Sequence, residues 1–170
     1  MVESLPCIVS HRYPVSRQLA FQPLTRPETD AERLGRMQRY EHEAYAEGAA
    51  YVAGVDEAGR GCLAGPVVAA AVILPRQWAS SRINDSKQLT PAQREAVFPR
   101  IQQQAVSIGI GSIPADTIDA VNILQATYLA MEQAIAALSV TPHYLLIDAL
   151  TLHRLAIPQR ALIKGDSRSL

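Results

Sequence analysis

Cysteine is scarce in this sequence. Its 170 residues include two cysteines, Cys7 and Cys62, which lie far apart and form no CxxC pair. This spacing argues against a disulfide framework or a cysteine-ligated zinc site, and we expect the protein to work in a reducing, cytoplasmic compartment. Surface or packing roles are expected for the four histidines, which lack mutual metal-binding spacing: His11, His42, His143 and His153.

An excess of either charge is also missing. Sixteen basic residues balance sixteen acidic ones, so attraction to a polyphosphate must come from local patches or bound cations.

The longest apolar run, residues 63–75, is broken by Gly65 and Pro66 and is shorter than the ~20 residues of a membrane-spanning helix. We therefore expect no membrane span. The start of the chain, with Glu3 and no continuous apolar stretch, also argues against a secretory signal.

The composition is that of one globular domain with additions at its N-terminal side. Hydrophobic residues make up 48% of the sequence and charged residues 19%. Scattered prolines and no sustained period predict an irregular arm over residues 1–28. A capping box at Thr29-Asp30-Ala31-Glu32, followed by apolar residues at helical spacing, predicts one helix over residues 29–48. Residues 49–170 are expected to form the domain itself.

Strand-like patterns begin at residue 49. Short apolar runs that favour strands occur at 51–56, 67–74, 106–110, 144–147 and 161–163. The run at 106–110 alternates strictly, which is typical of a strand with one buried face. The run at 144–147 ends in Asp148 and has the length of a short buried strand.

Two helices are expected between these strands. Thr90-Pro91-Ala92-Gln93 is a capping box with proline at the first helical position, and Pro99 should kink or shorten the helix that follows. Asn122 can cap a second helix. Its apolar positions recur at steps of four and three and predict a core-facing stripe: Leu124, Tyr128, Met131, Ile135 and Leu138. Strands alternating with helices predict an α/β domain around a mixed central sheet flanked by helices.

Acidic side chains follow two of the apolar runs. Val55 leads into Asp56 and Glu57, and the later run leads into Asp148. A carboxylate at the end of a buried strand is costly to desolvate unless something pairs with it, and a divalent cation suits several carboxylates together. A single acid of this kind is more often a turn residue, but the recurrence favours a hard-metal site. Since neighbours on a regular strand point to opposite faces, Asp56 and Glu57 can share one ion only if the strand ends there.

A glycine-rich turn follows the first acidic pair. Gly59 and Gly61 permit a positive φ and close backbone approach to a ligand, and Arg60 between them can hold a phosphate by two parallel hydrogen bonds. Asp85-Ser86-Lys87 is typical of a solvated turn, with a hydroxyl and a cation for phosphate as the functional alternative. Lys164-Gly165-Asp166 is also typical of an exposed turn.

These motifs together resemble the bacterial ribonuclease HII family, the type 2 ribonucleases H. The resemblance extends from about residue 30 to the end of the chain and is carried by the segments 53–61, 63–74, 84–89, 122–127 and 146–148, which occur in the order the family shows. It implies a ribonuclease H-like fold. It also implies an endonuclease that hydrolyses the RNA strand of RNA/DNA hybrids and cuts on the 5′ side of ribonucleotides embedded in duplex DNA. No membrane and no obligate protein partner are expected.

The resemblance also implies roles for individual residues. Four acids would hold two Mg²⁺ or Mn²⁺ ions, and Asp56, Glu57 and Asp148 match three of them. The turn at Gly59, Arg60 and Gly61 would contact the sugar and phosphate at the ribonucleotide, whose 2′-hydroxyl distinguishes RNA from DNA. Backbone phosphate would be contacted by Ser86 and Lys87.

The resemblance further predicts C-terminal helices, with the fourth acid and a tyrosine, beyond Leu170. The chain would then be a C-terminally incomplete catalytic domain, and the alternative function is a weakly active or inactive hybrid-binding fragment of the enzyme. A magnesium-binding ATPase is disfavoured because the sequence contains no GxxxxGK[ST] phosphate loop.

Overall fold

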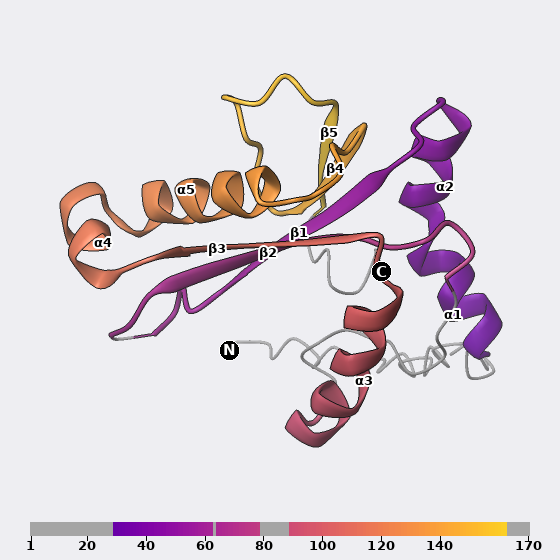
Figure 1. Ribbon diagram of the computed structural model, residues 1–170, viewed down its shortest axis with the longest axis horizontal. Helices are drawn as coiled ribbons and strands as arrows, with labels where there is room; N and C mark the ends of the chain where they lie inside the picture. Colours follow the sequence, from indigo (N-terminus) through magenta and orange to yellow (C-terminus); the bar gives the residue numbers. More distant parts are fainter. Residues whose placement is uncertain (1–28, 63, 79–88, 163–170) are drawn as a thin grey trace, which may run out of the picture.

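The computed structural model describes residues 29–62, 64–78 and 89–162 (Figure 1). Its centre is a five-stranded sheet in the order β3-β2-β1-β4-β5. The strands are β1 (Val52–Ala58), β2 (Val67–Ile73), β3 (Ser107–Ile113), β4 (Tyr144–Asp148) and β5 (Gln159–Leu162). β2 is antiparallel to both β1 and β3, whereas β1, β4 and β5 run parallel. The five runs of apolar residues thus became five strands of one mixed sheet.

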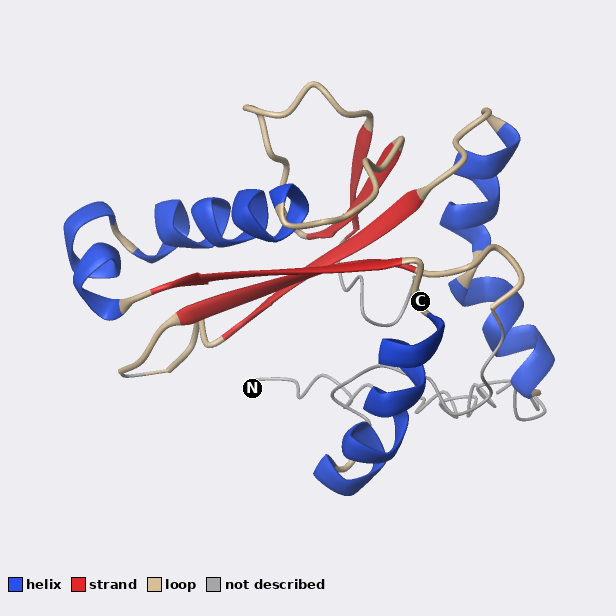
Figure 2. Cartoon of the chain, viewed as in Figure 1, coloured by secondary structure: helices blue, strands red, loops and turns tan. Residues whose placement is uncertain are grey.

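Helix α5 (Ile123–Ala136) covers one face of this sheet, over β1, β2 and β3 (Figure 2). The helix lies so close to β3 that a Cβ built on Gly109 would collide with the carbonyl oxygen of Ala134. One on Gly111 would collide in the same way with that of Ala130. The hydrogen side chain of glycine is what lets the helix backbone approach the strand.

The expected apolar stripe on α5 is partly wrong. Met131 and Ile135 are buried as expected, but Leu124 is 37% exposed. Small residues occupy most of the contact with the sheet, and the buried positions of α5 are Ala126, Thr127, Ala130, Met131, Ala134 and Ile135. Because the helix sits directly on the glycines of β3, there is no room for large side chains along its centre.

The opposite face of the sheet is covered at one end by α2 (Arg39–Ala46), which α1 (Asp30–Met37) precedes and contacts. The expected capping box is present: the Thr29 hydroxyl accepts from the Glu32 amide, and the Glu32 carboxylate accepts from the Thr29 amide. The single helix expected over 29–48 is instead two helices. The chain leaves helical geometry at Gln38, with φ −85° and ψ 3°, where its side chain donates to the carbonyl of Trp78.

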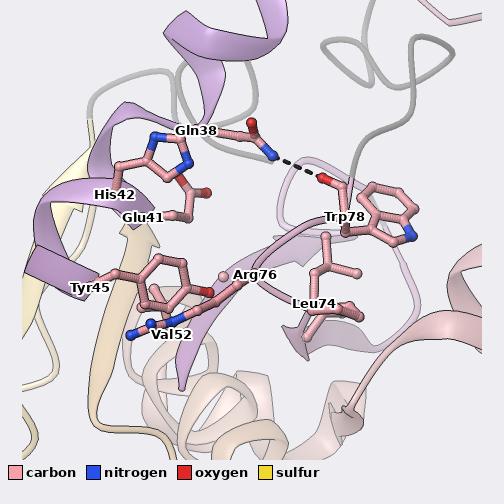
Figure 3. A pocket seen from close by; sticks show the side chains of 11 residues that line it. Gln38, Glu41, His42, Tyr45, Val52, Leu74, Arg76 and Trp78 are labelled. Atoms are coloured by element: carbon pink, nitrogen blue, oxygen red, sulfur yellow. Dashed lines mark hydrogen bonds between the residues drawn. The ribbon is translucent and has the colours of Figure 1, made fainter. Parts of the chain in front are cut away.

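Figure 3 shows where α2 meets the sheet. The Arg76 guanidinium stacks over the Tyr45 ring, 4.3 Å from its centroid, and donates to the Ala49 carbonyl oxygen at 2.7 Å. Burial raises the pKa of the Tyr45 phenol; the Glu41 carboxylate acts in the same direction, and Arg76 opposes it. The cavity enclosed here has a volume of about 30 Å³, room for about two water molecules, so we interpret it as a packing gap.

Two further helices connect the strands. α3 (Pro91–Gln104) begins with the expected capping box, but it runs through Pro99 without being shortened. α4 (Ala115–Val121) was not expected from the sequence. Asn122, with a φ of 72°, separates α4 from α5. No described helix is long and apolar enough to cross a membrane.

Candidate metal and nucleic-acid site

The parallel pairing of β1 with β4 brings Asp56 and Asp148 together. Val55 and Ile147 form the last pair of this register, and Asp56 and Asp148 are the residues that directly follow them in the two strands. Side chains of paired residues in neighbouring strands lie on the same face, about 4.8 Å apart in backbone position. Asp56 and Asp148 therefore lie beside each other on the face that also carries Val52 and Leu146. Asp56 is exposed and Asp148 half-buried.

The backbone locally supports the Asp56 carboxylate. Its Oδ1 accepts a hydrogen bond of 2.7 Å from the Glu57 amide. The second carboxylate oxygen is not used in this bond. A side chain held in this way on an exposed part of the sheet is accessible to a ligand from solvent.

Glu57 does not lie on the same sheet face as Asp56. β1 extends two residues beyond the run expected at 51–56: it continues to Ala58, with Glu57 paired to Ala69, and the expected glycine-rich turn follows it. The pleat of a regular strand then turns Glu57 to the α5 face, away from Asp56. Its carboxylate lies 3.6 Å from the guanidinium of Arg60, and its side chain is 14% exposed. A metal-ligand role for Glu57 stays a prediction.

The turn after β1 depends on a glycine. Gly59 has a φ of 89°, and a Cβ there would lie 2.6 Å from the backbone oxygen of Pro66. The Cys62 amide donates to the Gly59 carbonyl, which closes the turn. Within it the Arg60 side chain is 41% exposed, and Gly61 faces open space. The turn thus carries the positively charged side chain of Arg60 four residues after Asp56 in the chain.

The loop after Asp148 contains residues that the sequence did not mark. Ala149 has a φ of 54°, and its amide donates to the Leu162 carbonyl at 3.0 Å. Further along, the Gln159 side chain pairs with both backbone groups of Leu152. Glutamine is ordinarily a solvent-exposed residue, so no sequence signal distinguishes Gln159.

Two expected site residues cannot be placed, because Ser86 and Lys87 lie outside the described residues. The turn expected at residues 164–166 also lies outside them. Within residues 29–62, 64–78 and 89–162, no group of three or more histidine, cysteine, aspartate or glutamate side chains is positioned to hold a metal ion. The described part of the site is therefore a pair of aspartates, Asp56 and Asp148, with Arg60 nearby in the chain.

The comparison with known proteins identifies the family. The family model described as ribonuclease HII matches residues 53–169. The chain belongs to the ribonuclease HII family. The ribonuclease HII of Geobacillus thermodenitrificans is 54% identical over 138 residues, which cover 81% of this chain and 53% of that protein. The ribonuclease HII of Desulfitobacterium hafniense is 50% identical over 140 residues, which cover 82% of this chain and 54% of that protein.

These matches confirm the resemblance seen in the sequence. The chain spans about half the length of the curated relatives it matches. The match includes both aspartates and the whole sheet except Val52, the first residue of β1.

Solved structures confirm the fold. Bst-RNase HIII in complex with Mn²⁺ superposes with a TM-score of 0.57 at 17% identity, over 82% of this chain and 49% of that chain. The ribonuclease HII of Archaeoglobus fulgidus, in a complex with PCNA, superposes with a TM-score of 0.50 at 19% identity. The superposition covers 69% of this chain and 67% of that chain. At such identities the likeness concerns the fold alone, which is the expected ribonuclease H-like arrangement of a mixed sheet with flanking helices.

Proposed function

We propose that this ribonuclease HII chain carries the metal site of an endonuclease that hydrolyses the RNA strand of RNA/DNA hybrids and cuts on the 5′ side of ribonucleotides embedded in duplex DNA. The observation that carries the proposal is that Asp56 and Asp148 directly follow the last paired residues of two neighbouring parallel strands, Val55 and Ile147, and so fall on one face of the sheet. Family membership supports the substrate class. The Mn²⁺ complex of a fold relative supports the choice of cation.

The aspartate pair suits a hard divalent cation. Two carboxylates on adjacent strands offer oxygen ligands within a few ångströms of a common point, and such ligands favour Mg²⁺ or Mn²⁺ over softer metals. A bound divalent cation stabilises charge on phosphoryl oxygens and makes a water proton easier to remove. Asp56 and Asp148 would hold and orient the cation on the open face of the sheet.

A two-ion mechanism requires more acids than this pair. Glu57 can join only if the backbone at Asp56–Ala58 leaves the regular pleat when the ion binds. Asp166 is a second candidate: it follows Leu162 by four residues, and Leu162 is paired with Asp148. Four residues of chain span at most about 14 Å, which would let the Asp166 carboxylate reach the site, and we propose Asp166 as a further carboxylate there.

Arg60 is proposed to contact a substrate phosphate. Its replacement by alanine is expected to weaken binding to an RNA/DNA hybrid and to reduce the salt dependence by about one counterion, whatever the base sequence. Arg154, which forms an ion pair with Glu132 at 3.6 Å, provides a matched control. Binding isotherms at several salt concentrations measure both effects. An unchanged slope in Arg60→Ala would remove Arg60 from the phosphate contacts.

Cleavage and binding need separate measurements. In Mn²⁺ or Mg²⁺ buffer, the chain is expected to cut a duplex with one embedded ribonucleotide and to leave all-DNA duplex intact. The products should carry a 3′-hydroxyl and a 5′-phosphate. Binding of the hybrid without any cleavage would instead favour the alternative function, a hybrid-binding chain. Failure to bind either a divalent cation or a hybrid would reject both functions.

A further inference from the structure

Gln159 is bonded to the loop that follows Asp148 in an unusual way. Its Oε1 accepts from the Leu152 amide at 2.7 Å, and its Nε2 donates to the Leu152 carbonyl at 3.0 Å. One side-chain amide thus satisfies both backbone groups of a single residue, as a neighbouring strand would. The side chain of Leu152 is 1% exposed and belongs to the main hydrophobic core. Leu152 is therefore fixed both by its backbone and by its side chain.

The loop needs such an anchor because it begins under strain. Ala149, directly after Asp148, has a φ of 54°, a conformation that costs an alanine free energy and persists only where surrounding contacts hold it. On the β1 side the register ends at Ile147, so the pairing to β1 stops one residue before Asp148. On the β5 side the Ala149 amide is bonded to Leu162. Further along the loop, Leu150 packs partly buried against the core, and Leu152 is the first fully buried residue.

A second contact ties the same loop to α5. Arg154 forms an ion pair with Glu132 at 3.6 Å, and the loop and helix together line a cavity of about 200 Å³. Glu132 and Arg154 are 20% and 68% exposed. An ion pair with one partner so exposed contributes little on its own. The amide of Gln159, which makes two part-buried hydrogen bonds to Leu152, is the stronger restraint.

We infer that Gln159 is a positioning residue for the metal site: by fixing Leu152 it maintains the strained turn at Ala149 and thereby the orientation of the Asp148 carboxylate. The inference rests on the proposed function, since it takes Asp148 as a metal ligand. Outer residues that orient metal ligands typically change metal affinity by about 10- to 100-fold when replaced.

The test compares two glutamine-to-methionine variants. Methionine keeps the approximate length and volume of glutamine but removes both hydrogen bonds. Gln159→Met is expected to weaken Mn²⁺ binding by about tenfold. The matched control is Gln133→Met, since Gln133 also accepts from a backbone amide, that of Ser112 at 3.2 Å, on the far edge of the sheet. Calorimetric titration with Mn²⁺ should show wild-type affinity for the control.

A measurement on the wild-type protein covers the case in which Gln159→Met does not fold. Coupling free energies are reciprocal, so if the Leu152 anchor strengthens metal binding, metal binding must lower the population in which that anchor is open. Hydrogen exchange of the Leu152 amide should therefore slow when Mg²⁺ is added, while exchange of the Ser112 amide stays unchanged.

The outcomes separate the two hypotheses. No Mn²⁺ binding by the wild-type chain would reject the metal site itself. Wild-type binding together with unchanged affinity in Gln159→Met, or with no Mg²⁺ effect on Leu152 exchange, would reject the role of Gln159 alone. Weaker binding in Gln159→Met but not in Gln133→Met supports it.

Discussion

Asp56→Asn is expected to abolish hybrid cleavage and weaken Mn²⁺ binding by at least about 100-fold, while the protein remains folded. Asparagine keeps the shape of aspartate and can still accept the hydrogen bond from the Glu57 amide, but it removes one of the two paired negative charges. A loss of several kcal/mol of transition-state stabilisation corresponds to rates lower by factors on the order of thousands. Because Asp56 is exposed, the free energy of unfolding should change by no more than about 0.5 kcal/mol.

The matched control is Asp116→Asn. Asp116 is also exposed, and its Oδ1 accepts from the next amide, that of Thr117, at 2.8 Å. The control variant should bind Mn²⁺ like the wild type. Asp148→Asn should match Asp56→Asn, and Asp166→Asn should do so if Asp166 is part of the site. A parallel loss of thermal stability and activity in Asp56→Asn would mark Asp56 as structural.

Gly111→Ala is expected to destabilise the protein by about 3 kcal/mol or more. The added Cβ would collide with the Ala130 carbonyl oxygen and lie 2.8 Å from both the Ala134 amide nitrogen and the Gln133 Cβ. Two of these three atoms belong to the backbone of α5, so the helix itself must move off the sheet. Overpacking of a core typically costs about 1–3 kcal/mol and more where the backbone has to shift.

Gly35→Ala makes the same chemical change without the collision. Gly35 lies in α1, where an added Cβ meets nothing within 4 Å, and alanine favours a helix by up to about 1 kcal/mol over glycine. Urea denaturation gives the free energy of unfolding of both variants. Equal stability of Gly111→Ala and the wild type would show that α5 does not lie on β3 as closely as described.

Local signals in the sequence predicted local structure well. The capping boxes at Thr29 and Thr90 and the cap at Asn122 all form, because each depends on residues three positions apart. The break at Gln38 could not be predicted, since it coincides with a hydrogen bond to Trp78, forty residues away, which the local sequence does not reveal. The packing of α5 was missed because a search for large apolar residues ignores the alanines that face Gly109 and Gly111.

At the candidate site, too, features set by the local sequence were predicted, and features set by contacts between distant segments were not. Carboxylates at the ends of two apolar runs predicted that Asp56 and Asp148 are special, but their position on one face required the register of β1 with β4. The continuation of β1 past Glu57 is set by pairing with β2, which the sequence around Glu57 does not reveal. The bonding of Gln159 to Leu152 is equally invisible, because it depends on the path of the intervening loop.

The central claim is that Asp56 and Asp148 share a divalent cation. A crystal structure of the chain with Mn²⁺, using the anomalous signal of manganese to locate the ion, tests it most directly. We expect an anomalous peak about 2.2 Å from a carboxylate oxygen of each aspartate, on the sheet face opposite α5. A manganese ion bound elsewhere, or one held by neither aspartate at saturating concentration, would contradict the claim.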